Sequence, residues 1–215
     1  MPIAEKVYAS LCILFSGLII LGNLVYQKFV ILHVPSIYTF ELSAGAILYP
    51  LTFSITDLIT EFYGKARANF CVRFAILTNI VIATIIALID YLPATSWSKV
   101  DNLTFHKVFG FYSVAFIGSM IACYVSQAVD IMMYLWIYKL TKGKHLWLRN
   151  NGSTCISLFI DTTIVIVFLT MFKVLPAEQM LTLIFNSYVW KLFFTICSTP
   201  MFYIYVRIIK LILKN

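Results

Sequence analysis

The sequence predicts an all-α integral membrane protein with six transmembrane helices and both termini on the cytoplasmic side. The chain is 61% hydrophobic and only 12% charged, whereas a soluble domain carries about 25% charged residues. Apolar stretches recur along the whole chain at the length of about 20 residues that crosses a bilayer. Lysine and arginine are also distributed unevenly between the connections. These observations exclude a soluble enzyme, a disordered chain and a protein that binds nucleic acid directly through a basic patch.

Six apolar stretches are long enough to span, at residues 7–27, 39–63, 71–91, 111–138, 152–175 and 180–206. The first one is too long for a signal peptide and no small-residue cleavage site follows it, so we expect it to stay in the protein. Segment 29–38 is too short to cross and predicts an interfacial connection. Connection 92–110 has room for one short interfacial helix around Trp97. We therefore expect a single transmembrane domain over residues 1–215.

The charges in the connections predict the orientation of the spans. Eleven lysines and arginines fall on the side of the two termini and four fall on the opposite side, while Lys191 lies inside the last span. Lysine and arginine in short loops favour the cytoplasmic side. We therefore interpret the net charge of +7 as a topology signal first, rather than as a sign of an anionic partner.

Four acidic residues lie within the spans away from their ends, or near the inner boundary: Asp57, Glu61, Asp130 and Asp161. A charged residue at the centre of a membrane helix costs about 2.5–3.5 kcal/mol on insertion scales, so such residues face the bundle interior or a wet cavity. With a rise of about 1.5 Å per residue, the three aspartates lie roughly 10, 12 and 13 Å from the inner boundary. Three carboxyl groups from three helices are therefore predicted to share one layer.

Polar side chains accompany the aspartates at helical spacing. Ser126 and Gln127 precede Asp130 by four and three residues, and Ser157 precedes Asp161 by four. Residues at these spacings share one face of a helix. Each aspartate is therefore expected to lie in polar surroundings.

Glu61 is expected to have a structural role as an ion-pair partner. The spacing of four residues to Lys65 is the favourable order for a helical ion pair. Arg67 and Arg73 are alternative partners at the same end of the span.

Three further residues stand out inside the spans. Lys191 lies roughly 16 Å from the outer boundary, which implies either a carboxylate partner or a ligand acceptor. Pro50 and Pro200 each predict a kink. Such a kink either frees backbone carbonyls near a site or arises from packing alone.

The layer of acids has two interpretations. Buried acids can hold helices together through interhelical hydrogen bonds, worth about 0.6 kcal/mol on average, or they can line a polar cavity. Their matching depth and the neighbouring amides and hydroxyls favour the cavity. The chain has no His-Glu-x-x-His, no Gly-x-Ser-x-Gly and no phosphate-binding glycine loop. With no His or Cys beside the carboxylates, we expect no metal and no cofactor, and binding and passage rather than catalysis.

Several sequence blocks resemble the signature of the bacterial queuosine precursor transporter family, a group of vitamin-uptake-transporter-like membrane proteins. The blocks are Tyr49 to Thr52 followed by Thr56-Asp57 and residues 61–68; Ser126 to Asp130; Trp147 to Thr154 followed by Asp161-Thr162; and Lys191 with Pro200. The resemblance extends from about Asn23 to Tyr203. The chain departs from the family pattern at Leu158, where glutamine is frequent, and after Thr162, where an aliphatic stretch replaces an aromatic residue.

The resemblance implies a multi-pass protein of the bacterial inner membrane that takes up a 7-deazaguanine base for salvage into transfer RNA. The base would be 7-cyano-7-deazaguanine, 7-aminomethyl-7-deazaguanine or queuine. A guanine-like edge offers two N–H donors beside a carbonyl acceptor, and one carboxylate can accept both hydrogen bonds. An amide side chain can satisfy the carbonyl.

These considerations predict a substrate site composed of Asp57, Gln127, Asp130, Asn150, Asn151, Asp161 and Lys191. Asp130 or Asp161 would accept from the donor edge, while Gln127, or Asn150 or Asn151, would lie near the carbonyl. Lys191 would neutralise the remaining carboxylate. Structural or gating roles are predicted for Glu61, Lys65, Arg149, Pro50 and Pro200.

The source of energy and the assembly stay open at the level of sequence. A protonatable aspartate in mid-membrane could couple uptake to protons. The chain could instead be the substrate-binding subunit of a system driven by an ATPase module, or it could form a homo-oligomer. A small membrane enzyme or a structural subunit is a third class of function.

Overall fold

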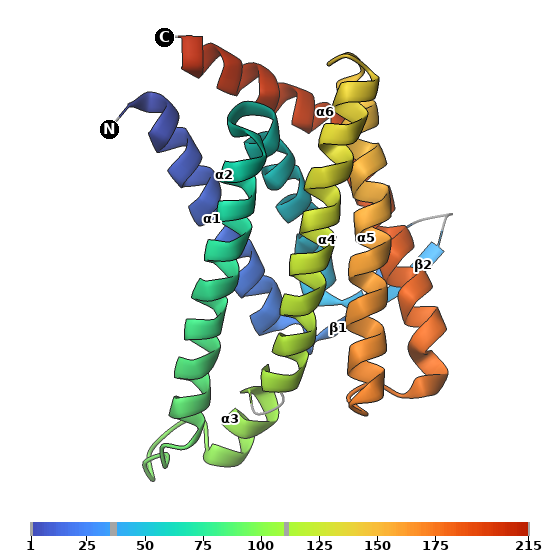
Figure 1. The fold of residues 1–215 in the computed structure, drawn as a ribbon. Coiled ribbons are helices and arrows are strands. Elements are labelled where there is room, and N and C mark those ends of the chain that lie inside the picture. Colours follow the sequence, from blue (N-terminus) through green and yellow to red (C-terminus); the bar gives the residue numbers. More distant parts are fainter. Residues whose placement is uncertain (1, 35–37, 110–111, 215) are drawn as a thin grey trace.

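The computed structural model describes residues 2–34, 38–109 and 112–214. Phe111, the predicted start of the fourth span, lies outside these ranges. In chain order the elements are α1 (Ile3–Val25), β1 (Phe29–Val34), β2 (Tyr38–Ser43), α2 (Ala44–Asp90), α3 (Asn102–Phe109), α4 (Tyr112–Leu140), α5 (Leu146–Met171), the 3-10 turn η1 (Ala177–Gln179) and α6 (Met180–Lys214). The long helices form a bundle, and both termini lie at the same end of it (Figure 1).

Helix α2 is two transmembrane segments that meet at Gly64. An unbroken helix of its 47 residues would be about 70 Å long, more than twice the thickness of the hydrocarbon core. Gly64 instead has φ 79° and ψ 175°, a conformation open mainly to glycine. The ribbon turns back on itself there (Figure 1). Five helices in the described part of the chain are long and apolar enough to span, and the turn in α2 brings the number of crossings to six.

The segment between the first two spans is a β-hairpin. Strands β1 and β2 pair antiparallel, with Phe29 opposite Ser43 and Ile31 opposite Glu41. The expectation of a connection at residues 29–38 is confirmed, but the predicted start of the second helix at Thr39 is wrong. The run of β-branched and aromatic residues here favours strand, and the helix begins only after Ser43, whose hydroxyl accepts a hydrogen bond from the Gly45 N–H at 3.2 Å.

The long connection after α2 contains the short helix α3, which begins five residues after Trp97. The prediction of a helix around Trp97 is therefore wrong in position, since Trp97 lies in a turn and is 83% exposed. Asp101 sets the start of α3 because its carboxylate accepts a hydrogen bond from the Thr104 N–H at 2.7 Å. This interaction with Thr104 also lowers the pKa of Asp101.

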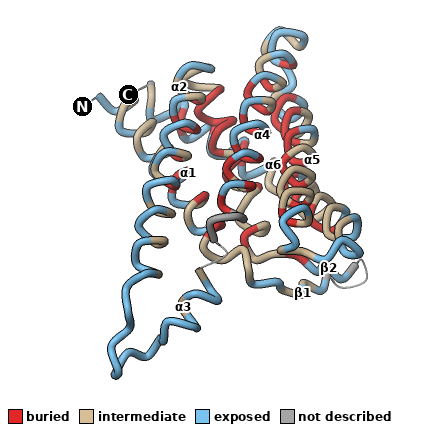
Figure 2. The backbone as a smooth tube through the Cα atoms, turned by 60° about the horizontal axis from the view of Figure 1, so that its bottom comes forward, coloured by how far each residue is buried: buried red, intermediate tan, exposed pale blue. Residues whose placement is uncertain are grey.

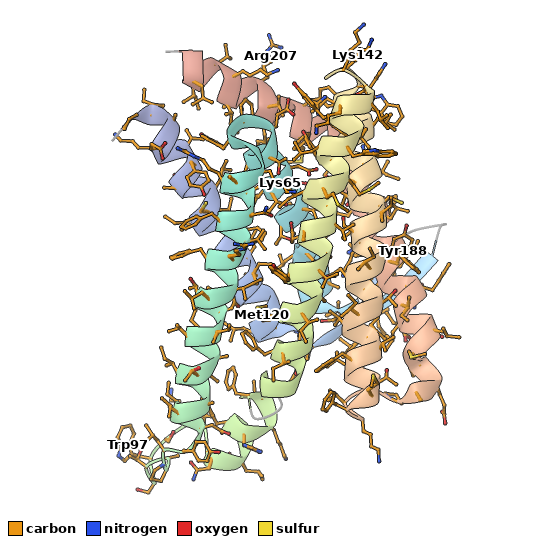
Figure 3. All side chains as sticks on the ribbon, viewed as in Figure 1. Lys65, Trp97, Met120, Lys142, Tyr188 and Arg207 are labelled. Atoms are coloured by element: carbon orange, nitrogen blue, oxygen red, sulfur yellow. The ribbon has the colours of Figure 1, made fainter. Side chains whose placement is uncertain are left out.

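The protein is an all-α integral membrane protein apart from this hairpin. Large apolar side chains are exposed on the outer faces of the helices, among them Phe70, Phe74 and Leu77 in the second segment of α2, as expected for surfaces in contact with lipid. Lys142 and Arg207 lie at the end of the bundle with the termini, and Trp97 lies at the opposite end (Figure 3). The cytoplasmic placement of the terminal end stays a prediction.

Buried residues concentrate where the first segment of α2, α4, α5 and α6 face one another (Figure 2). Much of this interior is polar, which is unusual between helices surrounded by lipid. Fully or almost fully buried polar residues on these helices include Thr52, Thr56, Asp57, Ser126, Gln127, Asp130, Asn150, Ser153, Ser157, Asp161, Lys191 and Thr195.

Candidate functional site

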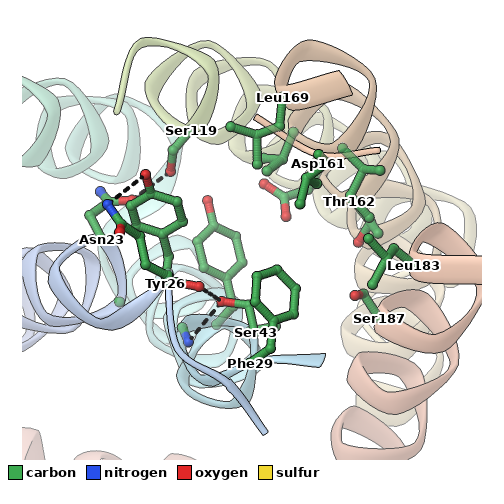
Figure 4. Close-up of a pocket in the computed structure, with 18 of the residues that line it drawn as sticks. Asn23, Tyr26, Phe29, Ser43, Ser119, Asp161, Thr162, Leu169, Leu183 and Ser187 are labelled. Carbon is green, nitrogen blue, oxygen red and sulfur yellow. Dashed lines mark hydrogen bonds between the residues drawn. The ribbon is translucent and has the colours of Figure 1, made fainter. Parts of the chain in front are cut away.

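A cavity of about 330 Å³ (Figure 4) lies beside the hairpin, in the half of the bundle away from the termini (Figure 1). Its wall is formed by the C-terminal part of α1, the hairpin, the first turns of α2 and the adjoining parts of α4, α5 and α6. The rim includes Phe29, which is half exposed, so the cavity reaches the surface. The polar side chains in its wall include Asn23, Tyr49, Ser119, Asp161, Thr162 and Lys191. Its volume lies at the lower end of the range for small-molecule sites.

An ion pair between α5 and α6 forms the charged part of the cavity wall. The Lys191 ammonium donates to Asp161 Oδ2 at 2.9 Å and to Thr162 Oγ1 at 3.1 Å. The same ammonium lies 4.7 Å from the centre of the Tyr49 ring, in cation–π geometry. Of the two partners predicted for Lys191, a carboxylate or a ligand acceptor, the structure has the carboxylate of Asp161.

A hydrogen-bonded cluster of polar side chains joins α1 to α4 and to the second segment of α2, and two of its members, Asn23 and Ser119, line the cavity. The Ser119 hydroxyl donates to Asn23 Oδ1 at 2.7 Å, and the Asn23 amide donates to Asn79 Oδ1 at 3.4 Å. Sequence analysis did not single out these residues, because each is an isolated polar residue in an apolar span. Their shared property, an amide or hydroxyl at mid-span, is the only signal the sequence offers.

Asp57 and Asp130 lie outside the wall of this cavity, in the closed core. Their side chains are 1% and 0% exposed, and the two carboxyl groups are within hydrogen-bonding reach of each other. The Ser157 hydroxyl donates to Asp130 Oδ1 at 2.9 Å. Among the described residues, Asp130 Oδ2 and both oxygens of Asp57 have no hydrogen-bond donor.

The predicted amide ligands are divided between the core and the terminal end. Gln127 is fully buried, accepts a hydrogen bond from Thr56 at 2.8 Å and leaves its amide nitrogen without a partner in the described part of the chain. Asn150 is also buried, and its carbonyl oxygen is likewise unpartnered there. Asn151 donates to Thr199 at 3.0 Å and so joins α5 to α6. None of the three lines the cavity, and their role in binding stays a prediction.

Arg149 and Glu61 close the core at the terminal end. Arg149 donates to Glu61 Oε1 at 2.6 Å and to the Gly143 carbonyl at 3.0 Å, and Tyr134 donates to Glu61 Oε2 at 2.9 Å. The expected pairing of Glu61 with Lys65 is wrong, because Lys65 is exposed and the buried guanidinium reaches Glu61 from α5.

The remaining residues with a predicted structural role differ in their surroundings. Arg67 does not pair with Glu61 but with Glu5, at 2.7 Å. The C-terminal part of α6 changes direction and lies across the end of the bundle (Figure 1), and Pro200 within that helix is a sufficient cause of such a kink. Pro50 is buried inside the first segment of α2.

No group of three His, Cys, Asp or Glu side chains among the described residues is placed to hold a metal ion.

Comparison with known proteins agrees with this architecture. The family described as "Putative vitamin uptake transporter" matches residues 43–205. The chain belongs to this transporter family. It is 30% identical over 176 residues to a protein of Bacillus subtilis (strain 168) named "Probable queuosine precursor transporter", an alignment that covers 79% of this chain and 75% of that protein. No solved structure matches the chain significantly.

Membership of the family assigns the chain to the transporters rather than the enzymes. It follows that this is a multi-pass membrane protein with a small-molecule substrate. The matched region begins at the end of the hairpin. It includes the Glu61–Arg149 and Asp161–Lys191 ion pairs and the facing residues Asp57 and Asp130.

Proposed function

We propose that this protein takes up a 7-deazaguanine precursor of queuosine across the bacterial inner membrane, for salvage into transfer RNA. The observation that carries the proposal is the Asp161–Lys191 pair in the wall of the cavity, in a chain that is similar to a protein named as a queuosine precursor transporter. With the termini in the cytoplasm, the cavity would be on the outer side, where a substrate to be taken up arrives.

The cavity provides groups that complement a guanine-like edge. Among the described residues, the Ser126 hydroxyl donates to Asp161 Oδ1 over a long distance of 3.4 Å, so this oxygen has capacity for the N–H donors of a base. Lys191 provides a positive charge near the carbonyl position while it holds the other oxygen of Asp161. The Asn23 amide on the facing wall is a second group that can bind the carbonyl. We therefore propose that Asp161, rather than Asp130, accepts the hydrogen bonds from the donor edge of the base. Asp57 makes no contact with the base in this arrangement.

The transport path would continue from the cavity toward the terminal end of the bundle. Gln127 and Asn150 have unpartnered polar atoms that a passing base could use once the helices separate at the terminal end. Arg149, Glu61 and Tyr134 bind the helices together there, and we assign them the role of the inner gate.

Transfer RNA modification tests the function directly. A bacterial strain that lacks both precursor synthesis and its own transporter would express this chain and receive each of the three bases in turn at low concentration. We expect queuosine to reappear in transfer RNA with one of the bases. The Asp161→Asn variant should abolish this recovery, while Asp90→Asn, the same change at a partly buried position near the outer end where the side chain pairs with His106, should leave it intact.

Two results would contradict the proposal. One is a wild-type protein that is present in the membrane, restores no modification and binds none of the three bases after purification. The other is full recovery with Asp161→Asn at a normal membrane level. If the purified protein binds a base but restores nothing in cells, the substrate assignment stands and a separate ATP-driven module is required for uptake.

A further inference from the structure

The buried core contains more acidic groups than basic ones. Glu61 pairs with Arg149 and Asp161 pairs with Lys191, and these two ion pairs use both of the buried bases found among the described residues. Asp57 and Asp130 then have no ion-pair partner among the described residues. A buried charge normally has a partner of opposite sign, because the loss of hydration is otherwise uncompensated.

The partner of each of these two aspartates is the other aspartate. Their carboxyl groups are within hydrogen-bonding reach, although α2 and α4 come from distant parts of the sequence. Two ionised carboxylates in contact repel each other strongly in a low-dielectric interior. One proton between them removes the repulsion and satisfies one of the oxygens without a donor.

We propose that Asp57 and Asp130 form the binding site of a proton that drives uptake, separate from the substrate cavity. This inference rests on the proposed function and adds its energy source. Asp130 already accepts a hydrogen bond from Ser157, whereas neither oxygen of Asp57 has a donor in the described part of the chain. Asp57 is therefore the residue that carries the proton and donates it in a hydrogen bond to Asp130.

The groups that face this pair come from three helices. Glu61 lies on the same helix as Asp57, Tyr134 faces it from α4, and Arg149 faces it from α5. Arg149 is held by Glu61 at 2.6 Å, so it does not serve as the counter-ion of Asp57.

Two serines connect the proton site to the substrate site. Ser157 on α5 donates to Asp130 on α4, and Ser126 on α4 donates to Asp161 on α5. On each helix the serine precedes the aspartate by four residues, so the antiparallel pair exchanges hydrogen bonds reciprocally. A change in the relative position of α4 and α5 therefore affects both sites, which is what coupled transport requires.

Two transport measurements on purified protein in liposomes distinguish proton coupling from movement of the base itself. The first measurement is exchange, in which vesicles loaded with unlabelled base take up labelled base with no ion gradient. The second is accumulation into empty vesicles that are more alkaline inside, with the membrane potential clamped by potassium and valinomycin. With one proton per neutral base, one pH unit supports at most about tenfold accumulation. We expect the wild type to approach this value and a protonophore to abolish it.

The variants Asp57→Asn and Asp130→Asn test the location of the site. We expect exchange to stay within about twofold of the wild type, since neither residue lines the cavity, and pH-driven accumulation to disappear. Asp90→Asn, the same substitution at the outer end, should keep both activities. Preserved exchange also shows that a variant is folded.

Each other outcome overturns the inference. Exchange by the wild type with no response to the pH gradient, or accumulation driven by sodium instead, would refute proton coupling while the proposed function stands. Accumulation that survives in both variants would place the proton elsewhere. Loss of exchange in both variants, with the proteins monodisperse, would place the pair in the path of the base. Absence of exchange by the wild type for a base that it still binds would refute proton-driven uptake by this chain, and absence of both exchange and binding would contradict the proposed function itself.

Discussion

Two buried aspartates on neighbouring parts of the bundle have opposite electrostatic environments. Asp161, in the cavity wall, has a lysine at 2.9 Å, whereas Asp57, in the closed core, has another carboxyl group. A carboxylate held by a fixed counter-ion can accept hydrogen bonds from a ligand with its other oxygen. A carboxyl group that faces another one takes up and releases a proton. The difference indicates how one small bundle can separate substrate recognition from energy coupling.

The two ends of the polar core also differ. On the cavity side the polar groups reach a surface opening, while on the terminal side Arg149, Glu61 and Tyr134 are joined by hydrogen bonds of 2.6 to 3.2 Å. The structure thus has one accessible side and one closed side. This asymmetry is what a transporter shows in one state of an alternating-access cycle.

The largest predicted effect distinguishes the paired aspartate from the unpaired one. Lys191→Met leaves Asp161 as a buried carboxylate without a counter-ion, and removal of one partner of a buried pair costs about 3–5 kcal/mol of stability. Asp57→Asn keeps the shape and lets an amide donate to Asp130 in place of the shared proton, so we expect unchanged or increased stability. Unfolding of the purified protein by increasing fractions of denaturing detergent measures both.

The double variant Asp161→Asn with Lys191→Met is the control. It removes both charges, so most of the lost stability should return even though substrate binding does not. A Lys191→Met protein as stable as Asp57→Asn would mean that the two aspartates do not differ in the way proposed here.

The sequence predicted the parts of this arrangement that follow from helical periodicity and membrane thickness. The turn between the second and third spans, the depth of the aspartates and the need of Lys191 for a carboxylate follow from local spacing and from the cost of charge in lipid. Local spacing also misled, since Glu61 pairs with Arg149, 88 residues away, rather than with Lys65. Which residue reaches Glu61 depends on how α5 packs against α2, and spacing within one helix carries no such information.

The sequence also did not predict that the site residues are divided between a cavity and a closed core. Asp130 and Asp161 have nearly the same predicted depth, and each follows a serine by four residues, so periodicity treats them as equivalent. They differ because the hairpin and the N-terminal part of α6 leave space beside Asp161. The hairpin itself was missed because its apolar, β-branched run was interpreted partly as the start of a helix.

An intermediate effect is expected from the close approach of helices in the cavity wall. A side chain on Gly45 would collide with the Gly22 carbonyl of α1, which is backbone and cannot rotate away. Gly45→Ala should therefore cost about 1–3 kcal/mol of stability, as overpacking does, and weaken base binding because Gly22 and Gly45 both line the cavity.

The matched control is Gly17→Ala, five residues earlier on α1 than Gly22. An added methyl group there meets nothing within 4 Å, and alanine is the better helix former by about 1 kcal/mol. We expect Gly17→Ala to be neutral or stabilising by the same detergent titration. Equal losses for the two variants would argue against a tightly packed cavity wall.

The smallest predicted effects concern the two serines that connect the sites. Both are fully buried, so alanine substitution removes the same group from equivalent surroundings. The bond from Ser157 to Asp130 is 2.9 Å long and that from Ser126 to Asp161 is 3.4 Å. A typical hydrogen bond contributes about 0.5–1.5 kcal/mol, so Ser157→Ala should lose stability in this range and Ser126→Ala less.

Transport assays distinguish the two serine variants more clearly than their stabilities do. Ser157→Ala removes the hydrogen-bond donor to Asp130, so it should reduce pH-driven accumulation while exchange persists. Ser126→Ala acts on the aspartate that already has a lysine, so exchange and accumulation should decline together and only slightly. A larger loss of proton coupling in Ser126→Ala than in Ser157→Ala would reverse the assignment, because the proton would then be held on the cavity side and the base on the closed side.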